Sequence, residues 1–453
     1  MWWLVSIISF LLALTASFNL LKQRYLRLTS LGWLIAIICI PLFGALAYFV
    51  VVVRSHQQRV DGLSCPLPYA NQQLSGIELD DAVAQLHGFQ SARAVSDVQV
   101  LQDDEFLPAL LSAINNAERS IALCTYILSG DVKGQVLEAL AKASQRGVQV
   151  FCLVDRIGSA LFRSRVMTLA HYKRSNFHAE VYHAPIGRSI LFAEKRLHSK
   201  ILVVDGEVGF LGAHNLRDAI NSSSPNFVHN LSVSFAGPVV RDLLESFAEL
   251  WRSNSGEAPA ALIDELRRER PTINSTGLGR IIYGDPIVQH GHYHEYLHGL
   301  LFSARKRLYI WMPYVIPSQG MRSNIIAAHK MGVDVKILMP KKSDSWLVDN
   351  AHALVINEWV DAGVPLAVGS GHFDHSKVLI IDDRVIVGST NLDYRSLHRN
   401  HETNIELYPS DASRQIEQAF LQRFQAAEFM RCVEVNKFKT LVQQATSLIA
   451  GLY

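Results

Sequence analysis

The chain has 453 residues, 49% of them hydrophobic, and its 43 basic and 41 acidic side chains leave a formal net charge of only +2. This length allows two or three domains with a large core. The near balance of charge argues against a protein that binds nucleic acid over a broad surface, because such proteins carry a clear basic excess.

Two apolar stretches lie at the start of the chain. Residues 2–21 are mostly apolar, and residues 31–53 contain no charged side chain. Each is long enough to cross a hydrocarbon core about 30 Å thick. The first stretch lacks the Lys or Arg that normally precedes the apolar part of a cleaved signal peptide. We therefore predict a membrane anchor in residues 1–58, with two retained transmembrane helices.

The side of the membrane that carries the rest of the chain is less directly indicated. Two spans place it on the same side as the N-terminus, but basic residues flank the second span at both ends, so their distribution does not decide the orientation. The five cysteines are an odd number, which we interpret as free thiols in a reducing compartment rather than a disulfide framework. This favours the cytoplasmic side.

The rest of the chain repeats itself. Residues 115–129 match residues 300–318, and residues 140–155 match residues 326–340, each with a helical pattern that leads into an apolar strand. Such repetition indicates internal duplication, and the alternation of helices and strands predicts an α/β fold with helices layered on a β-sheet. We expect two halves, residues 59–270 and 271–453, joined near Arg267. Apolar residues at helical spacing after Val433 predict a helix that packs on the core.

One motif also occurs twice, in matching places of the two halves. It reads His198-Ser-Lys200 and His375-Ser-Lys377, followed after four residues by Asp and later by a Gly-bounded turn that ends in Asn. His and Lys two positions apart on a strand point to the same face. The paired motifs therefore predict one composite site with pseudo-two-fold symmetry. Its expected members after the lysines are Asp205, Asn215, Asp382 and Asn391.

These residue types suit attack on an anionic phosphodiester. The lysines and the asparagine amides can neutralise and bind the phosphoryl oxygens. One imidazole can act as the nucleophile and the other as the general acid and then base. The two lysine charges take the place of Mg²⁺, so we expect no metal and no cofactor. The spacing turns Asp205 and Asp382 away from the histidines, which favours a turn-stabilising or ion-pairing role.

The paired motifs resemble those of the phospholipase D superfamily, and several flanking segments resemble its bacterial cardiolipin synthase branch. These segments are Tyr126, residues 155–159, 312–317, 342–344 and 391–396, and the apolar stretch at 31–53. The resemblance implies a mixed β-sheet in each half and a catalytic role for both HxK-x4-D motifs. It also implies that Glu402 is the carboxylate that orients a histidine. The implied enzyme is anchored in the bacterial inner membrane, faces the cytoplasm and acts on anionic phospholipids, without a nucleic-acid partner.

The chain departs from the family pattern at three places. Val228-His229-Asn230 replaces the family's W-x-D in the first half, so an amide stands where an acid is expected. The turn after Asp382 is one residue shorter than the turn after Asp205, which predicts a tighter hairpin. The segment that opens the second half also differs, reading YGDPIVQHGHYHEYLH from Tyr283.

That last segment contains an alternative site. His294, Glu295 and His298 fit H-E-x-x-H, a zinc-binding pattern on a helix. We favour a partly exposed helix, because no third ligand stands at a recognised spacing.

The function that we expect is transfer of a phosphatidyl group between two phosphatidylglycerol molecules, giving cardiolipin and glycerol. Hydrolysis to phosphatidic acid is the alternative, and a nuclease is a more distant one. We expect His198 to be the nucleophile and His375 the general acid, with Glu402 beside His375 and only Asn230 in the first half. The sequence leaves the oligomeric state open.

Overall fold

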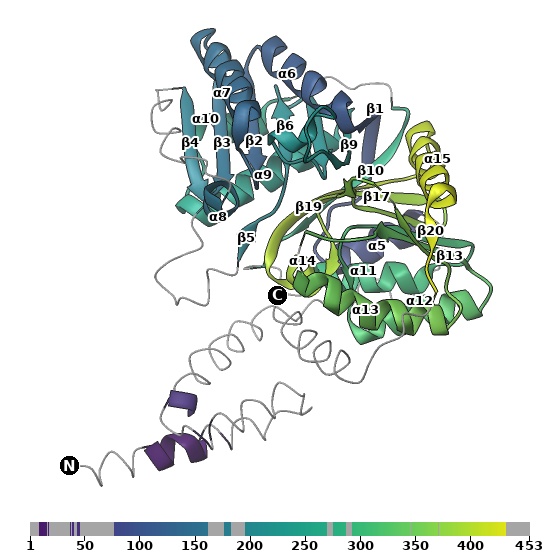
Figure 1. The fold of residues 1–453 in the computed structure, drawn as a ribbon. Helices are drawn as coiled ribbons and strands as arrows, with labels where there is room; N and C mark the ends of the chain where they lie inside the picture. Colours follow the sequence, from purple (N-terminus) through teal and green to yellow (C-terminus); the bar gives the residue numbers. More distant parts are fainter. Residues whose placement is uncertain are drawn as a thin grey trace. The chain divides into compact units, whose positions relative to one another are not determined.

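The computed structural model describes residues 9–15, 17, 37, 39, 43–45, 77–161, 176–182, 195–269, 275–286, 292–344, 346–369 and 371–431 (Figure 1). The chain divides into two compact units, Met1–Ala70 and Asn71–Tyr453. The second unit contains every element discussed below.

Most of the two predicted membrane spans and the predicted helix after Val433 lie outside the described residues. Within the described ranges, no helix has both the length and the apolar character that crossing a membrane requires. Free thiols are confirmed for the three cysteines in these ranges, of which Cys124 and Cys152 are buried.

The first half begins with a helix and contains a series of strands and helices in the predicted alternation. In chain order these are α5 (Ile77–Leu86), β1 (Arg93–Gln102), η2 (Asp103–Glu105), α6 (Phe106–Asn116), β2 (Ser120–Thr125), α7 (Gly130–Gln145), β3 (Gln149–Asp155), α8 (Arg156–Leu161), β4 (Phe177–Tyr182), β5 (Arg196–Leu197), β6 (Ile201–Val204), β7 (Val208–Gly212), η6 (Asp218–Ile220), β8 (Val228–His229), β9 (Leu231–Ala236), α9 (Val239–Ser255) and α10 (Ala260–Arg267).

The second half repeats this series with small additions. Its elements are β10 (Gly277–Gly284), α11 (His292–Ser303), β11 (Arg307–Trp311), β12 (Val315–Ile316), α12 (Gln319–Lys330), β13 (Asp334–Pro340), α13 (Trp346–Asp361), β14 (Leu366–Gly369), β15 (Phe373–Asp374), β16 (Val378–Ile381), β17 (Arg384–Gly388), β18 (Leu392–Asp393), α14 (Tyr394–His398), β19 (Asn400–Leu407), α15 (Asp411–Ala426) and β20 (Glu428–Phe429).

The strands of both halves join into one sheet at a central pair. In the described part of the chain the sheet has sixteen strands. The first half is ordered β4-β3-β2-β6-β7-β9-β1 and the second β10-β19-β17-β16-β11-β13-β14-β20, and the sixteenth strand, β5, pairs with β19 outside this order. Strands β1 and β10 pair antiparallel and connect the halves. In each half two neighbouring pairs are parallel and the rest antiparallel. Outward from β1 and β10 the order is the same, so the predicted duplicated α/β fold with mixed sheets is confirmed.

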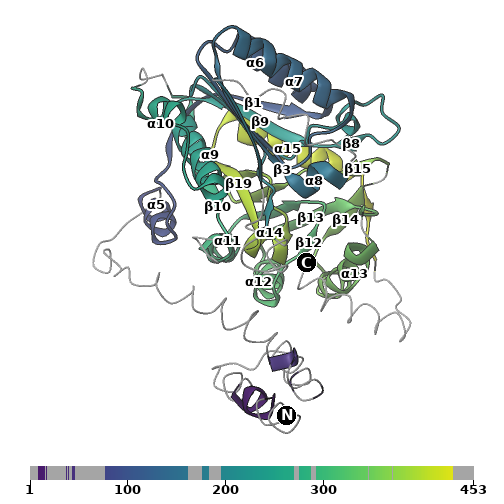
Figure 2. The same cartoon turned by 90° about the vertical axis from the view of Figure 1, so that its left-hand side faces the viewer.

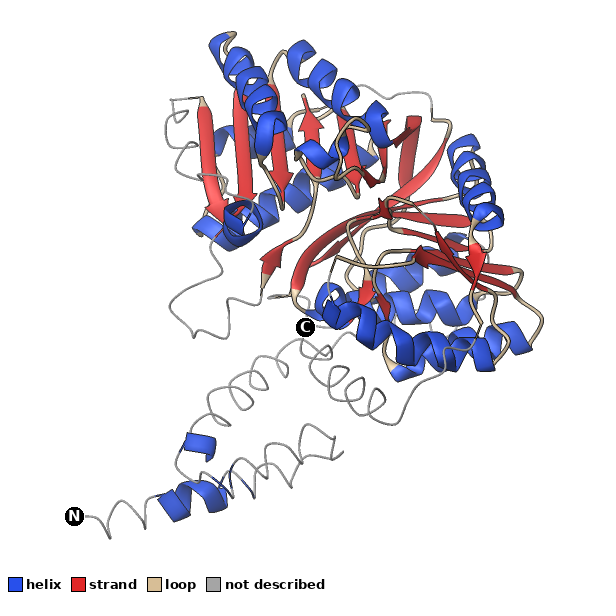
Figure 3. Ribbon diagram, viewed as in Figure 1, coloured by secondary structure: helices blue, strands red, loops and turns tan. Residues whose placement is uncertain are grey.

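Helices cover the sheet on both faces. One apolar cluster holds α6 and α7 against the first-half strands, and a second holds α11, α12 and α13 against the second-half strands. Figure 2 shows these two helix layers on opposite sides of the second unit, and Figure 3 shows the strands between them. A third cluster contains α9, α15 and strands of both halves, so each half is packed on both faces.

Helix α9 illustrates why these residues form these elements. Its buried side chains recur at helical spacing, as in Leu243, Phe247 and Trp251, while Arg241 and Glu245 lie outside and pair with each other. Burial of an aromatic side chain such as Phe247 stabilises the fold by about 1.5–3 kcal/mol. The helix is capped by Gly256, whose φ of 84° suits a glycine and whose N–H donates to the carbonyl of Arg252 at 2.8 Å.

The two motif hairpins differ as the sequence predicts. In the first, Val204 pairs with Val208, so three residues form the turn. In the second, Ile381 pairs with Arg384, so two residues form it. The tighter second hairpin is therefore confirmed.

Candidate active site

Both HxK segments lie between a short strand and the first strand of a hairpin. His198 follows β5 and leads into β6, and His375 follows β15 and leads into β16. Each lysine turns back to its own motif: Nζ of Lys200 donates to the carbonyl of His198 at 2.7 Å, and Nζ of Lys377 donates to the carbonyl of His375 at 2.8 Å. The repeated sequence thus has a repeated local structure.

The short strand before each HxK segment pairs with a strand of the other half. Strand β5 pairs in parallel with β19 of the second half, and β15 pairs in parallel with β8 of the first. The N–H of His198 donates to the carbonyl of His401 at 3.0 Å, and the N–H of His375 donates to the carbonyl of His229 at 2.8 Å. These matching contacts bring the two motifs to one site, as the duplication predicts.

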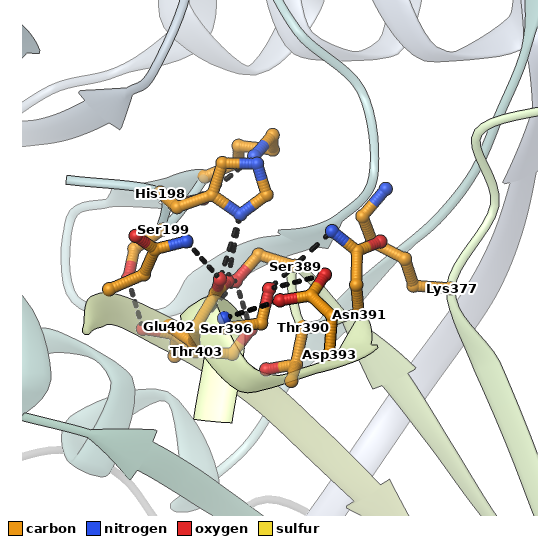
Figure 4. A network of polar contacts seen from close by, with 12 residues as sticks. His198, Ser199, Lys377, Ser389, Thr390, Asn391, Asp393, Ser396, Glu402 and Thr403 are labelled. Atoms are coloured by element: carbon orange, nitrogen blue, oxygen red, sulfur yellow. Dashed lines mark hydrogen bonds and ion pairs between the residues drawn. The ribbon is translucent and has the colours of Figure 1, made fainter. Parts of the chain in front are cut away.

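The side chain that orients each histidine also comes from the other half. Nδ1 of His198 lies 2.9 and 3.0 Å from the carboxylate oxygens of Glu402 (Figure 4). Nδ1 of His375 lies 3.2 Å from Oδ1 of Asn230. The expectation that Glu402 partners His375 is therefore wrong. It assumed that each half supplies its own orienting group, whereas the parallel pairing of β5 with β19 and of β15 with β8 exchanges them.

Glu402 is fully buried and held on several sides. Ser389 donates its hydroxyl hydrogen to Oε2, and Nδ2 of Asn400 donates to Oε1 at 3.1 Å. Burial alone would raise the pKa of Glu402, but attraction to His198 and the hydrogen bonds hold the pKa below its usual value. The carboxylate therefore stays ionised and accepts the Nδ1 hydrogen of His198, which leaves Nε2 with a lone pair.

Asn230 is held differently. Its Nδ2 donates to the carbonyl of Val228 at 2.8 Å, so its oxygen faces His375 and accepts from Nδ1. The position that matches Ser389 is Ala213, which has no hydroxyl to offer an acid. The two halves therefore differ at two linked positions. The second half has a serine beside a glutamate, and the first half has an alanine and an asparagine at the matching positions.

Burial favours the neutral form of both histidines while the site holds no anionic substrate. It lowers the pKa of His198 to about 4, although Glu402 acts in the opposite direction. The pKa of His375 is lowered well below its ordinary value by burial and then by the charges of Lys377 and Lys200. A neutral imidazole is what both a nucleophile and a base require.

The lysines form a concentrated positive site. Burial lowers the pKa of Lys200 to about 8, with Glu402 acting against it. Burial and then the charge of Lys200 lower the pKa of Lys377 well below its ordinary value. A bound phosphate would favour the charged form of both side chains. The site is therefore suited to an anion.

The two predicted asparagines hold matching places in the two halves, each three residues beyond the second strand of its motif hairpin. Asn391 is buried and its Nδ2 approaches the hydroxyl of Ser396 at 3.5 Å. Among the described residues, Oδ1 of Asn215 and of Asn391 is buried without a hydrogen-bond partner. Amides with unused hydrogen-bonding capacity in a buried site can orient a polar ligand.

The structure gives Asp205 and Asp382 a backbone-binding role at the far ends of β6 and β16. Asp205 accepts from the N–H groups of Glu118, Arg119 and Ser120 at 2.7–3.0 Å. Asp382 accepts in the same way from three consecutive residues starting at Arg305, at 2.7–3.2 Å. Both have a φ near +50° at the turn. The expected turn-stabilising role is confirmed by these contacts.

Sequence reasoning assigned no role to several residues around the histidines. Arg217 lies near enough to His375 to lower its pKa further, and near Asp344. The ring of Tyr126 meets the ring of His198 edge-on at 5.1 Å. Ser389 was also missed, although the contrast between Gly-Ser-Thr-Asn and Gly-Ala-His-Asn in the two motifs carries the signal.

The H-E-x-x-H segment forms helix α11. The rings of His294 and His298 lie 5.8 Å apart, and Nε2 of His294 lies 3.4 Å from the hydroxyl of Ser318. Glu295 approaches His87 instead, at 3.9 Å. The described ranges contain no group of three or more His, Cys, Asp or Glu side chains placed to hold a metal ion.

Comparison with known proteins decides the family. The family described as cardiolipin synthase, PLD-like domain, matches residues 110–251 and 297–424, more than half of the chain and both HxK motifs. The chain belongs to this family. It is a phosphatidyltransferase of the phospholipase D-like type.

Individual relatives are similar in sequence to this chain over most of its length and of their own. A cardiolipin synthase of Staphylococcus aureus strain Mu50 is 28% identical over 446 residues, which cover 91% of this chain and 88% of the relative. Cardiolipin synthase A of Pseudomonas entomophila is 29% identical over 423 residues, covering 88% and 86%. The crystal structure of a phosphatidylserine synthase of Haemophilus influenzae has the same fold, with a TM-score of 0.62 at 14% identity over 82% of this chain and 98% of that one.

Proposed function

We propose that this enzyme transfers a phosphatidyl group from one phosphatidylglycerol to another, through a phosphohistidine on His198, and releases glycerol. Membership of the cardiolipin synthase family supports the lipid substrate and the product. The crossed contacts support the mechanism, because they give the two histidines different partners.

In the first step Nε2 of His198 attacks phosphorus and the bond from phosphorus to the glycerol oxygen breaks. The anionic phosphate of the bound lipid favours the protonated form of His375. In that form His375 gives its Nε2 proton to the glycerol oxygen, so glycerol leaves neutral. Phosphorylation places positive charge on the His198 ring. The ionised Glu402 stabilises this charge, as the amide of Asn230 could not for His375.

In the second step the hydroxyl of another phosphatidylglycerol gives its proton to neutral His375 and attacks phosphorus. The bond from phosphorus to nitrogen breaks, cardiolipin forms and His198 returns to its neutral state. Lys200, Lys377, Asn215 and Asn391 bind the phosphoryl oxygens in both steps. The residues supply all the charge that the reaction needs, so the proposed mechanism has no metal.

We further propose that residues 1–58 anchor the enzyme in the bacterial inner membrane with the halves at 59–270 and 271–453 on the cytoplasmic side. The apolar stretches at 2–21 and 31–53 support the anchor. A membrane-bound lipid substrate makes such an anchor useful, since enzyme and substrate then share one surface.

The direct test is reconstitution of the full chain in vesicles of phosphatidylglycerol, with lipids and glycerol measured by mass spectrometry. Cardiolipin and glycerol should appear in equal amounts. Accumulation of phosphatidic acid would instead make water the acceptor and the enzyme a hydrolase.

A further inference from the structure

A two-stranded ribbon, β8 with β15, carries the catalytic His375 and its partner Asn230. In this ribbon Phe373 pairs with Val228 and Asp374 with His229. Successive side chains of an extended chain point to opposite faces. Asn230 and His375 are in contact on the active-site face, so His229 and Asp374 lie on the reverse face, where both line one cavity.

Asp103 holds the first strand of this ribbon. Its Oδ1 accepts from the N–H of Asn230 at 2.9 Å and its own N–H donates to the carbonyl of Asn230 at 3.1 Å. Its Oδ2 lies 2.9 Å from Nδ1 of His229. The φ of Asp103 is +50°, a conformation that costs free energy in any residue except glycine and persists where contacts enforce it. These three contacts fix the backbone on both sides of Asn230.

Arg423 connects this strand to the other one. Its guanidinium lies 3.5 Å from Oδ2 of Asp103 and 3.4 Å from Oδ2 of Asp374, and it stacks over Trp311 with 5.3 Å to the ring centroid. Trp311 donates from Nε1 to the same oxygen of Asp374 at 3.0 Å. One arginine of α15 thus bridges a carboxylate of the first half and a carboxylate next to His375.

The ribbon that carries His198 is held by different groups. Arg196 of β5 forms a buried ion pair with Asp155, and Oδ2 of Asp155 accepts from the N–H of Leu197 at 3.0 Å. There His401 takes the position of His229, and its ring nitrogens lie 3.0 and 2.9 Å from the hydroxyls of Tyr182 and Tyr283. His401 is fully buried. The ion pair that supports His198 is therefore buried, with Arg196 6% and Asp155 0% exposed, whereas the one that supports His375 is about one quarter exposed at Arg423 and Asp103.

We propose that Arg423, through Asp103 and Asp374, is a positioning residue for His375: it holds the ribbon so that Nε2 of His375 meets the leaving oxygen. Partly exposed ion pairs contribute little to stability, so the loss of Arg423 displaces the ribbon without unfolding the protein. A displacement of about 1 Å at a reacting group lowers rates by about 100-fold. The inference rests on the proposed role of His375 as general acid.

The test uses two leaving groups. Glycerol leaves phosphatidylglycerol only with a proton from the general acid, whereas p-nitrophenolate leaves phosphatidyl-p-nitrophenol without one at neutral pH. The full-length Arg423→Gln enzyme should form cardiolipin from phosphatidylglycerol about 10- to 100-fold more slowly than the parent, as is typical when a supporting contact is removed. Its first-turnover burst of p-nitrophenolate should stay within about threefold of the parent, because that step needs His198 and not His375.

Two variants complete the design. Arg423→Lys keeps the charge and should recover most of the cardiolipin rate. Arg414→Gln removes another arginine of the same helix, which pairs with the exposed Asp411, and should leave both rates unchanged. Thermal unfolding midpoints of all variants should agree within about 3 °C, the scale expected for loss of a surface ion pair.

The outcomes are distinct. Selective loss with the alcohol leaving group supports the inference. Equal loss with both substrates, or no loss with either, overturns it. Failure of the parent enzyme to make cardiolipin at all would count against the proposed function instead. Release of glycerol to water would then replace cardiolipin formation as the acid-dependent reaction that is compared with the p-nitrophenolate burst.

Discussion

The carboxylate of Glu402 in the second half lies 2.9 Å from Nδ1 of His198 in the first, and the matching pair of Asn230 with His375 is uncharged. This crossed and unequal arrangement is the basis for the two different chemical roles that we propose for the two similar motifs. Their difference leads to the first three predictions.

Loss of the general acid should trap the covalent intermediate. In His375→Asn incubated with labelled phosphatidylglycerol, slow formation and slower release should leave an acid-labile, base-stable adduct that peptide mass spectrometry places on His198. An adduct found only in His198→Asn, and attached to His375, would reverse the roles.

Glu402→Gln should lower kcat by about 100- to 10,000-fold, because the amide cannot stabilise positive charge on the His198 ring and permits the wrong tautomer. Ser389→Ala should cost about 10-fold or less, since Glu402 keeps Asn400 and His198 as partners. Steady-state kinetics with phosphatidylglycerol checks both. A larger loss for Ser389→Ala than for Glu402→Gln would contradict the assigned role of the carboxylate.

Asn230→Asp should change the pH dependence rather than abolish activity. A carboxylate beside His375 raises the pKa of that imidazole by about 1–3 units. The acid form of His375 then persists to higher pH, so the basic limb of the pH profile of kcat/KM should shift to higher pH. Asn230→Ser, which adds no charge, is the control, and an unmoved basic limb in Asn230→Asp would assign that limb to another group.

Acid should destabilise the folded state through buried neutral histidines. Burial lowers the pKa of His214 to about 3 and that of His352 to about 4, both below the usual value near 6.5. The unfolded chain therefore binds protons that the folded state does not, and stability falls as pH drops from about 6.5 toward 4, by about 1.4 kcal/mol per pH unit for each histidine.

The variant His214→Asn tests this acid destabilisation at a histidine that takes no part in the proposed reaction. His214 stacks on Phe106 at 4.2 Å and binds Ser232, so the variant is less stable at every pH. The fall in its thermal midpoint between pH 7 and pH 5 should nevertheless be smaller than that of the parent by about 2–4 °C. Parallel curves would show that His214 does not titrate on unfolding in this range.

Chelation should leave activity unchanged. In the proposed mechanism Lys200 and Lys377 supply the positive charge at the phosphate, and His294 pairs with Ser318 rather than with Glu295. Cardiolipin formation in EDTA should equal that in buffer, and His298→Ala should stay within about threefold of the parent, as for a substitution at a partly exposed position. Activity lost to EDTA and restored by Zn²⁺ would support the H-E-x-x-H alternative.

Much of this protein follows from its sequence alone. The repeated helix and strand patterns determine the duplicated α/β fold, because the period of apolar residues specifies each element and the repeat specifies each half. The paired motifs determine which histidines and lysines meet, and the length of each turn determines the difference between the hairpins. These features are local, or are copies of one another, and local patterns can be read along the chain.

The partners of the histidines were decided by the tertiary structure. Whether Glu402 contacts His198 or His375 depends on β5 pairing with β19 across the halves, a contact between residues about 200 positions apart. No periodicity records such a pairing, since each short strand has only two residues and could pair in either half. The bridge from Arg423 to Asp103 and Asp374 has the same origin: its three side chains come from η2, β15 and α15, and only the packing of the two halves brings them together.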